Sequence, residues 1–140
     1  MPTRPAVHLA IAVDDLSRAR QFYGSVLGLP EGRSTEQWID WDLHGHQLVT
    51  HVVADGPSSP GASSVDGHAV PIPHFGLLLE TARFHELADR LRGAGVDFLV
   101  EPYLRFPGEP AEQWTMFFRD PSGNALEFKA FRDESKVFTP

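Results

Sequence analysis

Apolar and polar residues alternate in short runs along this chain, and each such run predicts a strand. In residues 6–13 (AVHLAIAV) the larger apolar side chains share one face, and His8 shares the other with two alanines. The larger residues are Val7, Leu9, Ile11 and Val13. We expect them to face a core, which leaves His8 on a face lined by small residues.

Helical spacing follows the first strand. Apolar residues recur with a helical period over residues 16–27, where Asp14 or Asp15 is the expected cap and Gly28 the expected end. A tight turn is expected at 44–46. The strands expected after the helix are 32–34, 38–43 and 47–53. The first half therefore has the order β-α-β-β-β.

The same order returns in the second half. Residues 73–80 (PHFGLLLE) alternate like the first strand, so that His74 matches His8 and Gly76 matches Ala10. A helix is expected over residues 81–94, ended by Gly95. The strands expected after it are 97–103, 113–119 and 125–131.

The segment between the halves has a different composition. Residues 54–73 are rich in Gly, Pro and Ser and lack periodicity, which indicates a linker or a flexible cover. We therefore predict one α+β domain over residues 1–140. It contains two βαβββ modules, at about 6–54 and 73–131, that form cupped mixed β-sheets with flanking helices. A tail follows at 132–140.

Residues 117–131 (FFRDPSGNALEFKAF) read as strand, tight turn and strand. Alternation in the second of these strands puts Glu127 and Lys129 on one face. A carboxylate in the middle of a strand is either a surface charge or a group that points into a cleft as a metal ligand, acid or base.

The internal repeat places candidate metal ligands in matching positions. If the modules pair about a pseudo-twofold axis, His8 and His74 approach one another inside a curved sheet. Aligning the two last turns on their glycines matches Glu127 with Val49. Two His and one carboxylate beside small residues suit a divalent metal that keeps open coordination positions. These residue types therefore predict a metal site made by His8, His74 and Glu127.

Composition narrows the possible functions. The chain has 140 residues, no Cys, seven His and a net charge of −7. The lack of Cys excludes disulfides and Cys-based zinc sites, and the acidic balance argues against binding to nucleic acid. With no long apolar run and no leader pattern after Met1, we expect a cytoplasmic protein without a membrane span.

These features resemble the vicinal oxygen chelate superfamily, which includes glyoxalase I, bleomycin and fosfomycin resistance proteins, methylmalonyl-CoA epimerase and the extradiol dioxygenases. The stretches that carry the resemblance are VHLAIAVDDLSRARQFYGSVLGL, PHFGLLLE and FFRDPSGNALEF, which span nearly the whole chain. The resemblance implies paired βαβββ modules, metal ligands at His8, His74 and Glu127, and a homodimer.

Within this superfamily the chain looks closest to short, single-polypeptide dioxygenase-like members. Glyoxalase I typically adds a fourth ligand, a Glu, where Val49 stands here. Three ligands resemble the extradiol dioxygenases, in which Fe(II) or Mn(II) chelates a catecholate while O2 binds an open position. A Tyr and a His assist in that class. The Tyr position falls at Phe117, and the His is His51 or His46.

We therefore predict a metal-dependent, dioxygenase-like enzyme that acts on a small molecule with two vicinal oxygens, with His51 as its catalytic residue. A partly exposed strand histidine without a catalytic role is the other reading of His51. One alternative function is a glyoxalase-like lyase or isomerase that uses Zn(II) or Ni(II). The other is a non-catalytic, bleomycin-resistance-type protein that binds a ligand without a metal.

Overall fold

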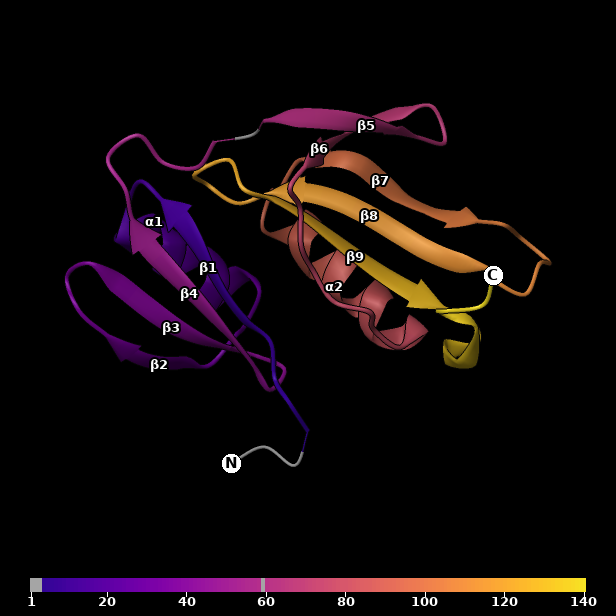
Figure 1. The fold of residues 1–140 in the computed structure, drawn as a ribbon, viewed down its shortest axis with the longest axis horizontal. Coiled ribbons are helices and arrows are strands. Elements are labelled where there is room, and N and C mark those ends of the chain that lie inside the picture. The colour runs from indigo at the N-terminus through magenta and orange to yellow at the C-terminus, as the bar shows by residue number, and fades with distance from the viewer. Residues whose placement is uncertain (1–3, 59) are drawn as a thin grey trace. The chain divides into compact units, whose positions relative to one another are not determined.

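In the computed structural model, which describes residues 4–58 and 60–140, the chain forms two compact units. The first unit holds the described residues through Ser58 together with Asp120–Asn124, and the second holds the rest of the described chain. Helices and strands occur in both units, so the predicted α+β class is confirmed (Figure 1). The boundary after Ser58 falls inside the segment that we expected to join two modules.

The first unit contains a four-stranded sheet with the order β1-β4-β3-β2 (Figure 1). Its strands are β1 (His8–Val13), β2 (Glu31–Ser34), β3 (Trp38–Leu43) and β4 (His46–Val52). Strand β1 runs parallel to β4, and the register pairs His8 with Gln47 and Ala12 with His51. Residues that pair in a sheet point to the same side, so His8 and His51 share one face. The opposite face carries the buried Ile39, Trp41 and Leu48.

The helix of the first unit begins where we expected it but does not keep the α-helical period. Asp15 caps α1 (Leu16–Ala19) by accepting a hydrogen bond from the Arg18 N–H. The chain then continues as a π-helix, η1 (Arg20–Val26). The wider turn buries two consecutive aromatic residues, Phe22 and Tyr23, which a narrow apolar stripe does not accommodate.

The second unit contains a three-stranded antiparallel sheet with the order β7-β8-β9 (Figure 1). Its strands are β7 (Phe98–Arg105), β8 (Gln113–Arg119) and β9 (Ala125–Phe131). Helix α2 (Thr81–Gly93) packs on one face of this sheet, where the rings of Phe84 and Trp114 lie 6.2 Å apart. A short 3-10 turn, η2 (Glu134–Lys136), follows in the tail. No helix in residues 4–58 or 60–140 is long and apolar enough to cross a membrane.

Residues 73–80 were expected to form a strand, and the structure has no regular strand there. The segment pairs with β9 through two isolated bridges and four backbone hydrogen bonds. These bridges are parallel and join Phe75 to Leu126 and Leu78 to Lys129. The carbonyl of Phe75 accepts a hydrogen bond from the Glu127 N–H at 2.8 Å. The segment thus takes the place beside β9 that β1 takes beside β4, and the β-α-β-β-β order is present in both units.

The backbone of the segment approaches that of β9 very closely at Gly76. A Cβ placed on Gly76 would lie 1.6 Å from the carbonyl oxygen of Glu127, so only glycine fits there. In the first unit the matching residue is Ala10, whose register partner is Val49. Because Ala10 and Gly76 each lie two residues after the candidate histidine of their segment, this pairing agrees with the match between Val49 and Glu127.

The segment 54–73 contains a hairpin that the sequence reasoning missed. Strands β5 (Gly61–Val65) and β6 (His68–Ile72) are antiparallel and are joined by Asp66 and Gly67, which have φ of +50° and +80°. Two consecutive positive φ values are typical of a type I′ turn, and an Asp-Gly pair is a strong signal for it. The expectation of a segment without regular structure is therefore wrong for residues 61–72.

The turn between β8 and β9 is organised by Asp120, whose side chain is buried in the first unit. Its carboxylate accepts hydrogen bonds from the N–H groups of Ser122 and Asn124 and, at 2.7 Å, from the hydroxyl of Tyr23. Burial, followed by the negative charge of Asp120, raises the pKa of Tyr23 well above its ordinary value. Tyr23 therefore stays protonated and serves as a donor.

Replacing Gly76 by Ala should destabilise the protein, because the new methyl group overlaps the backbone of β9. We expect the Gly76→Ala variant to lose about 2–3 kcal/mol of unfolding free energy, the upper range for overpacking. Urea unfolding followed by circular dichroism measures this loss. Gly93→Ala is the matched control, since a Cβ on Gly93 meets nothing within 4 Å and alanine favours the helix. Equal stability of the two variants would contradict the proposed contact.

Replacing Tyr23 by Phe removes one donor from the buried Asp120 carboxylate. We expect a loss of about 1.5–3 kcal/mol, as is typical of hydrogen bonds to charged groups. Tyr103→Phe removes the same atom from a bond to the more exposed Asp66 and should cost less. Thermal and urea unfolding of both variants test the order, and a Tyr103→Phe loss as large as that of Tyr23→Phe would overturn it.

Candidate functional site

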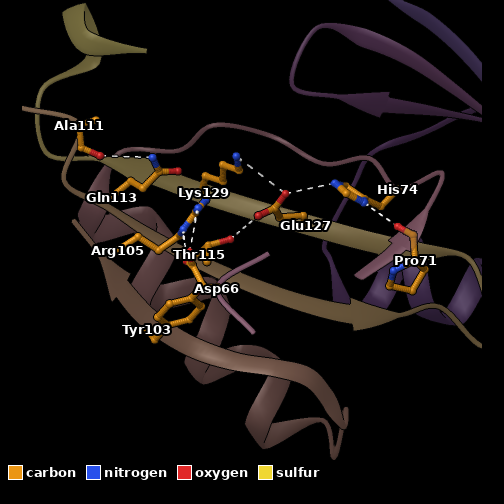
Figure 2. Close-up of polar contacts among 10 residues, drawn as sticks. All are labelled: Asp66, Pro71, His74, Tyr103, Arg105, Ala111, Gln113, Thr115, Glu127 and Lys129. Atoms are coloured by element: carbon orange, nitrogen blue, oxygen red, sulfur yellow. Dashed lines mark hydrogen bonds and ion pairs between the residues drawn. The ribbon is translucent and has the colours of Figure 1, made fainter. Parts of the chain in front are cut away.

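His74 and Glu127 meet in the second unit (Figure 2). The Nε2 atom of His74 lies 3.2 Å from Oε1 of Glu127, and the two side chains are 23% and 11% exposed. Glu127 points away from the α2 side because its neighbours Leu126 and Phe128, which are buried, lie on the opposite face of β9. Two of the three predicted metal ligands are thus adjacent, and Glu127 is not a surface charge.

The hydrogen bond made by Nδ1 of His74 determines the tautomer of the ring, and therefore what Nε2 presents to Glu127. Nδ1 lies 2.7 Å from the carbonyl oxygen of Pro71, and because a carbonyl only accepts, Nδ1 carries the proton. In the neutral form of the ring, Nε2 would direct its lone pair at a carboxylate oxygen. Two acceptors at this distance require a cation or a proton between them. A histidine that donates to a backbone carbonyl through its other nitrogen is also the usual arrangement of a metal ligand.

Further residues of the second unit hold the Glu127 carboxylate. The Thr115 hydroxyl donates a hydrogen bond to Oε2 at 2.5 Å, and the Lys129 ammonium lies 3.9 Å from Oε1 (Figure 2). A cavity of about 250 Å³ borders Glu127 and Lys129. Its lining residues are His74, Phe75, Gly76, Leu77, Leu78, Glu127 and Lys129. The carboxylate is therefore oriented by its neighbours and reachable from the cavity.

Phe117 occupies the position where the resemblance to dioxygenases implies an assisting Tyr. Its buried ring packs edge-on against the ring of His74, with centroids 5.0 Å apart. This contact supports the orientation of the imidazole. A phenyl ring has no hydroxyl, so Phe117 supplies no proton at this position.

His8 and His51 belong to the first unit. Nδ1 of His8 lies 2.8 Å from Oε1 of Gln47, an acceptor, so Nδ1 is the donor and Nε2 is left available as a ligand atom. His51 is exposed on β4, four residues beyond Gln47 on the same face. At the rise of a strand this places it about 13 Å along the sheet from the level of His8. His51 thus has no direct contact with His8.

The described residues, 4–58 and 60–140, contain no group of three or more His, Asp or Glu side chains that would hold a metal ion. His74 and Glu127 are brought together in the second unit, while His8 and His51 lie in the first. The three-residue ligand set and the role of His51 stay predictions.

Asp66, Tyr103 and Arg105 form a second polar cluster in the second unit, which the sequence reasoning did not predict. Asp66, at the tip of the β5–β6 hairpin, accepts hydrogen bonds from Tyr103 at 2.7 Å and from Nε of Arg105 at 2.5 Å (Figure 2). These two bonds lower the pKa of Asp66, while burial and the bond to Asp66 raise the pKa of Tyr103 to about 12. The Asp-Gly pair at residues 66 and 67 was the signal in the sequence that could have identified Asp66.

Thr115 was also missed. Its register partners are Tyr103 on β7 and Lys129 on β9, so all three lie on the face that carries Glu127. The alternation of Gln113, Thr115 and Phe117 along β8 would have placed Thr115 on that face. Its bond to Glu127 depends on the register between β8 and β9, which the turn at Asp120 sets.

Comparison with known proteins gives the family. Residues 6–128 match the family model described as the Glyoxalase/Bleomycin resistance protein/Dioxygenase superfamily. A solved glyoxalase/bleomycin resistance protein/dioxygenase from Alicyclobacillus acidocaldarius is 32% identical, with a TM-score of 0.76 over 96% of this chain and 97% of that one.

Two solved structures of lower identity share the fold. The fosfomycin resistance protein FosX from Listeria monocytogenes is 18% identical, with a TM-score of 0.71 over 98% of this chain and 100% of that one. A lactoylglutathione lyase from Agrobacterium tumefaciens is 21% identical, with a TM-score of 0.64 over 92% and 96% of the two chains. With the family match over most of its length, the chain belongs to the glyoxalase/bleomycin resistance protein/dioxygenase superfamily.

Proposed function

We propose that this chain is a metal-dependent enzyme that binds a small substrate through two vicinal oxygens. The observation that carries the proposal is the pairing of His74 with Glu127, in which ring nitrogen Nε2 faces a carboxylate oxygen at 3.2 Å while Nδ1 is held by the Pro71 carbonyl. Superfamily members typically use divalent metals, and such an ion satisfies both groups.

The residues fit this ion by their chemistry. His74 and Glu127 would bind it from the second unit, and His8 would supply the third ligand through Nε2, because Gln47 occupies its Nδ1. Thr115 orients the Glu127 carboxylate, and the Pro71 carbonyl fixes the His74 tautomer. When bound, the metal would hold the two substrate oxygens and lower the pKa of a substrate hydroxyl.

The reaction we favour resembles that of the extradiol dioxygenases, with Fe(II) or Mn(II) as the metal. The reason is Val49, which matches Glu127 in the register of the first unit and is only 4% exposed. A valine cannot act as the fourth ligand that the resemblance to glyoxalase I implies. His51, on the same face as His8, is the proposed proton donor and acceptor for the substrate.

One observation favours a second candidate, a lyase or isomerase that uses Zn(II) or Ni(II). Phe117 stands in the position of the assisting Tyr of the dioxygenases, so proton transfer there must come from another residue. Solved neighbours that share the fold include a lactoylglutathione lyase and a fosfomycin resistance protein. The metal distinguishes the two candidates, because ring cleavage requires a redox-active ion and isomerisation does not. We expect a homodimer in either case, since superfamily members are often dimers.

The first test is the metal content of protein purified without a His-tag or chelator. We expect about one divalent ion per chain, and its loss in His8→Ala, His74→Ala and Glu127→Gln, because each removes one donor. His44→Asn is the matched control, since His44 is an exposed turn residue with a positive φ that Asn tolerates. Elemental analysis after reconstitution reads out the result. A wild type that binds no metal would leave ligand sequestration as the better account.

The second test is the reaction class and the role of His51. With Fe(II) or Mn(II) bound, we expect oxygen uptake when each of a panel of catechols is first mixed with the protein anaerobically and oxygen is then added. His51→Ala should lower kcat about 100-fold while its metal content stays that of the wild type, as expected for loss of a general acid or base. An unchanged kcat in His51→Ala would remove this residue from the proposal. Turnover with Zn(II) or Ni(II) and no oxygen uptake would favour the lyase or isomerase.

A further inference from the structure

The tip of the β5–β6 hairpin inserts a carboxylate between two donors of the three-stranded sheet. Nε of Arg105 binds Oδ2 of Asp66 at 2.5 Å, Nη2 lies 3.4 Å from Oδ1, and the Tyr103 hydroxyl donates to Oδ2 at 2.7 Å (Figure 2). A guanidinium that reaches both oxygens of a carboxylate, with a phenol on one of them, is a strong arrangement for carboxylate recognition.

The surroundings of Arg105 and Tyr103 favour the binding of an anion. The Arg105 side chain is 14% exposed, and its guanidinium lies over the ring of Phe106 with the centroid 4.7 Å away. Tyr103 has a pKa raised to about 12, so its hydroxyl remains a donor at neutral pH. The two donors belong to β7, a strand of the three-stranded sheet, and the carboxylate that binds them belongs to a turn, the kind of element that is usually the more mobile.

The hairpin that carries Asp66 has limited apolar anchorage. It forms a separate two-stranded sheet, and the residues of β5 before Val65 are small and exposed. Val65 and Val70 pack with Val100, Phe117 and Tyr103, and the ring centroid of His68 lies 5.5 Å from that of Tyr103. The Asp66 contacts thus form a substantial part of what holds the hairpin tip to the sheet.

Tyr103 and Arg105 lie near the candidate metal ligand. Tyr103 is the register partner of Thr115, and Thr115 donates to Glu127. The row of Tyr103 and Thr115 lies two residues, about 7 Å, along the sheet from the row of Phe117 and Glu127, and the row of Arg105 lies two residues further, about 13 Å in all. A small molecule that reaches Glu127 could therefore extend an anionic group to Arg105.

We infer that Arg105 and Tyr103 form a binding subsite for the carboxylate of a small-molecule ligand, and that Asp66 occupies this subsite as an internal competitor. The ligand carboxylate takes over the bonds that Asp66 releases, and the hairpin tip leaves the sheet. Combined with the proposed function, on which this further step rests, the subsite implies that the substrate is an anionic molecule with two vicinal oxygens. The subsite itself requires no metal.

The test uses benzoate as the probe and benzamide as its neutral counterpart, in the presence of a chelator. We expect Asp66→Asn to bind benzoate at least about tenfold more tightly than the wild type, because the competitor is weakened and a larger fraction of the protein is competent to bind. Asparagine tolerates the positive φ of residue 66, so the turn is kept. Benzamide binding should not tighten. Isothermal titration calorimetry measures both affinities.

Two arginine variants complete the experiment. Arg105→Met, alone or together with Asp66→Asn, should abolish benzoate binding, whereas Arg83→Met, which removes an exposed helix charge, should not change it. Hydrogen exchange in residues 61–72 should increase in Asp66→Asn and in benzoate-saturated wild type, which reports release of the hairpin from the sheet.

Two results would overturn the inference. One is an unchanged benzoate affinity in Asp66→Asn whose circular dichroism is that of the wild type. The other is benzoate binding in Arg105→Met as tight as in the wild type. Because these measurements are made without metal, a failure of the metal prediction leaves them interpretable, and a failure here leaves the metal prediction standing.

Discussion

The close approach of Gly76 to the Glu127 carbonyl is the constraint on which the candidate site depends. It lets residues 73–80 lie against β9, so that the Phe75 carbonyl pairs with the Glu127 N–H. That pairing brings the His74 ring to the Glu127 carboxylate on the face away from α2. The site is thus set by backbone contact first, and the side chains follow from it.

The two halves use one topology for different purposes. In the first, Ala10 and Val49 fill the places that Gly76 and Glu127 take in the second. The first therefore presents one candidate ligand, His8, beside an apolar residue. The second presents a histidine and a carboxylate, together with the threonine, lysine and carbonyl that orient them. A repeated fold has become chemically asymmetric through a few substitutions on one face.

Much of the fold could be read from alternation, which reports directly on burial in a sheet. The strands at 38–43, 113–119 and 125–131 agree with β3, β8 and β9 in both bounds. The π-helical turns of η1 could not be predicted from a sequence period. They bury Phe22 beside Tyr23, and that burial is decided by packing against the sheet. The β5–β6 hairpin was missed because its Gly, Pro and Ser content outweighed the Asp-Gly turn signal.

Some features of the candidate site could likewise be predicted from the sequence, and others could not. Strand alternation and the match of His74 with His8 predicted that His74 and Glu127 face one cleft, and the structure brings their side chains within 3.2 Å. The tautomer of His74 could not be predicted from the sequence. It depends on the backbone carbonyl of residue 71, and every type of residue has such a carbonyl. The bond from Thr115 likewise depends on the register between β8 and β9, which only the folded turn defines.

The Asp66 turn also has a consequence for the time course of recognition. If a ligand enters only after the turn has left Arg105 and Tyr103, the observed binding rate will reach a plateau as ligand concentration rises, at the rate of turn release. Residues in the hairpin would then set how fast a ligand is captured, while residues on β7 would set how long it stays. Speed and residence would thus be controlled by separate parts of the chain and could change independently.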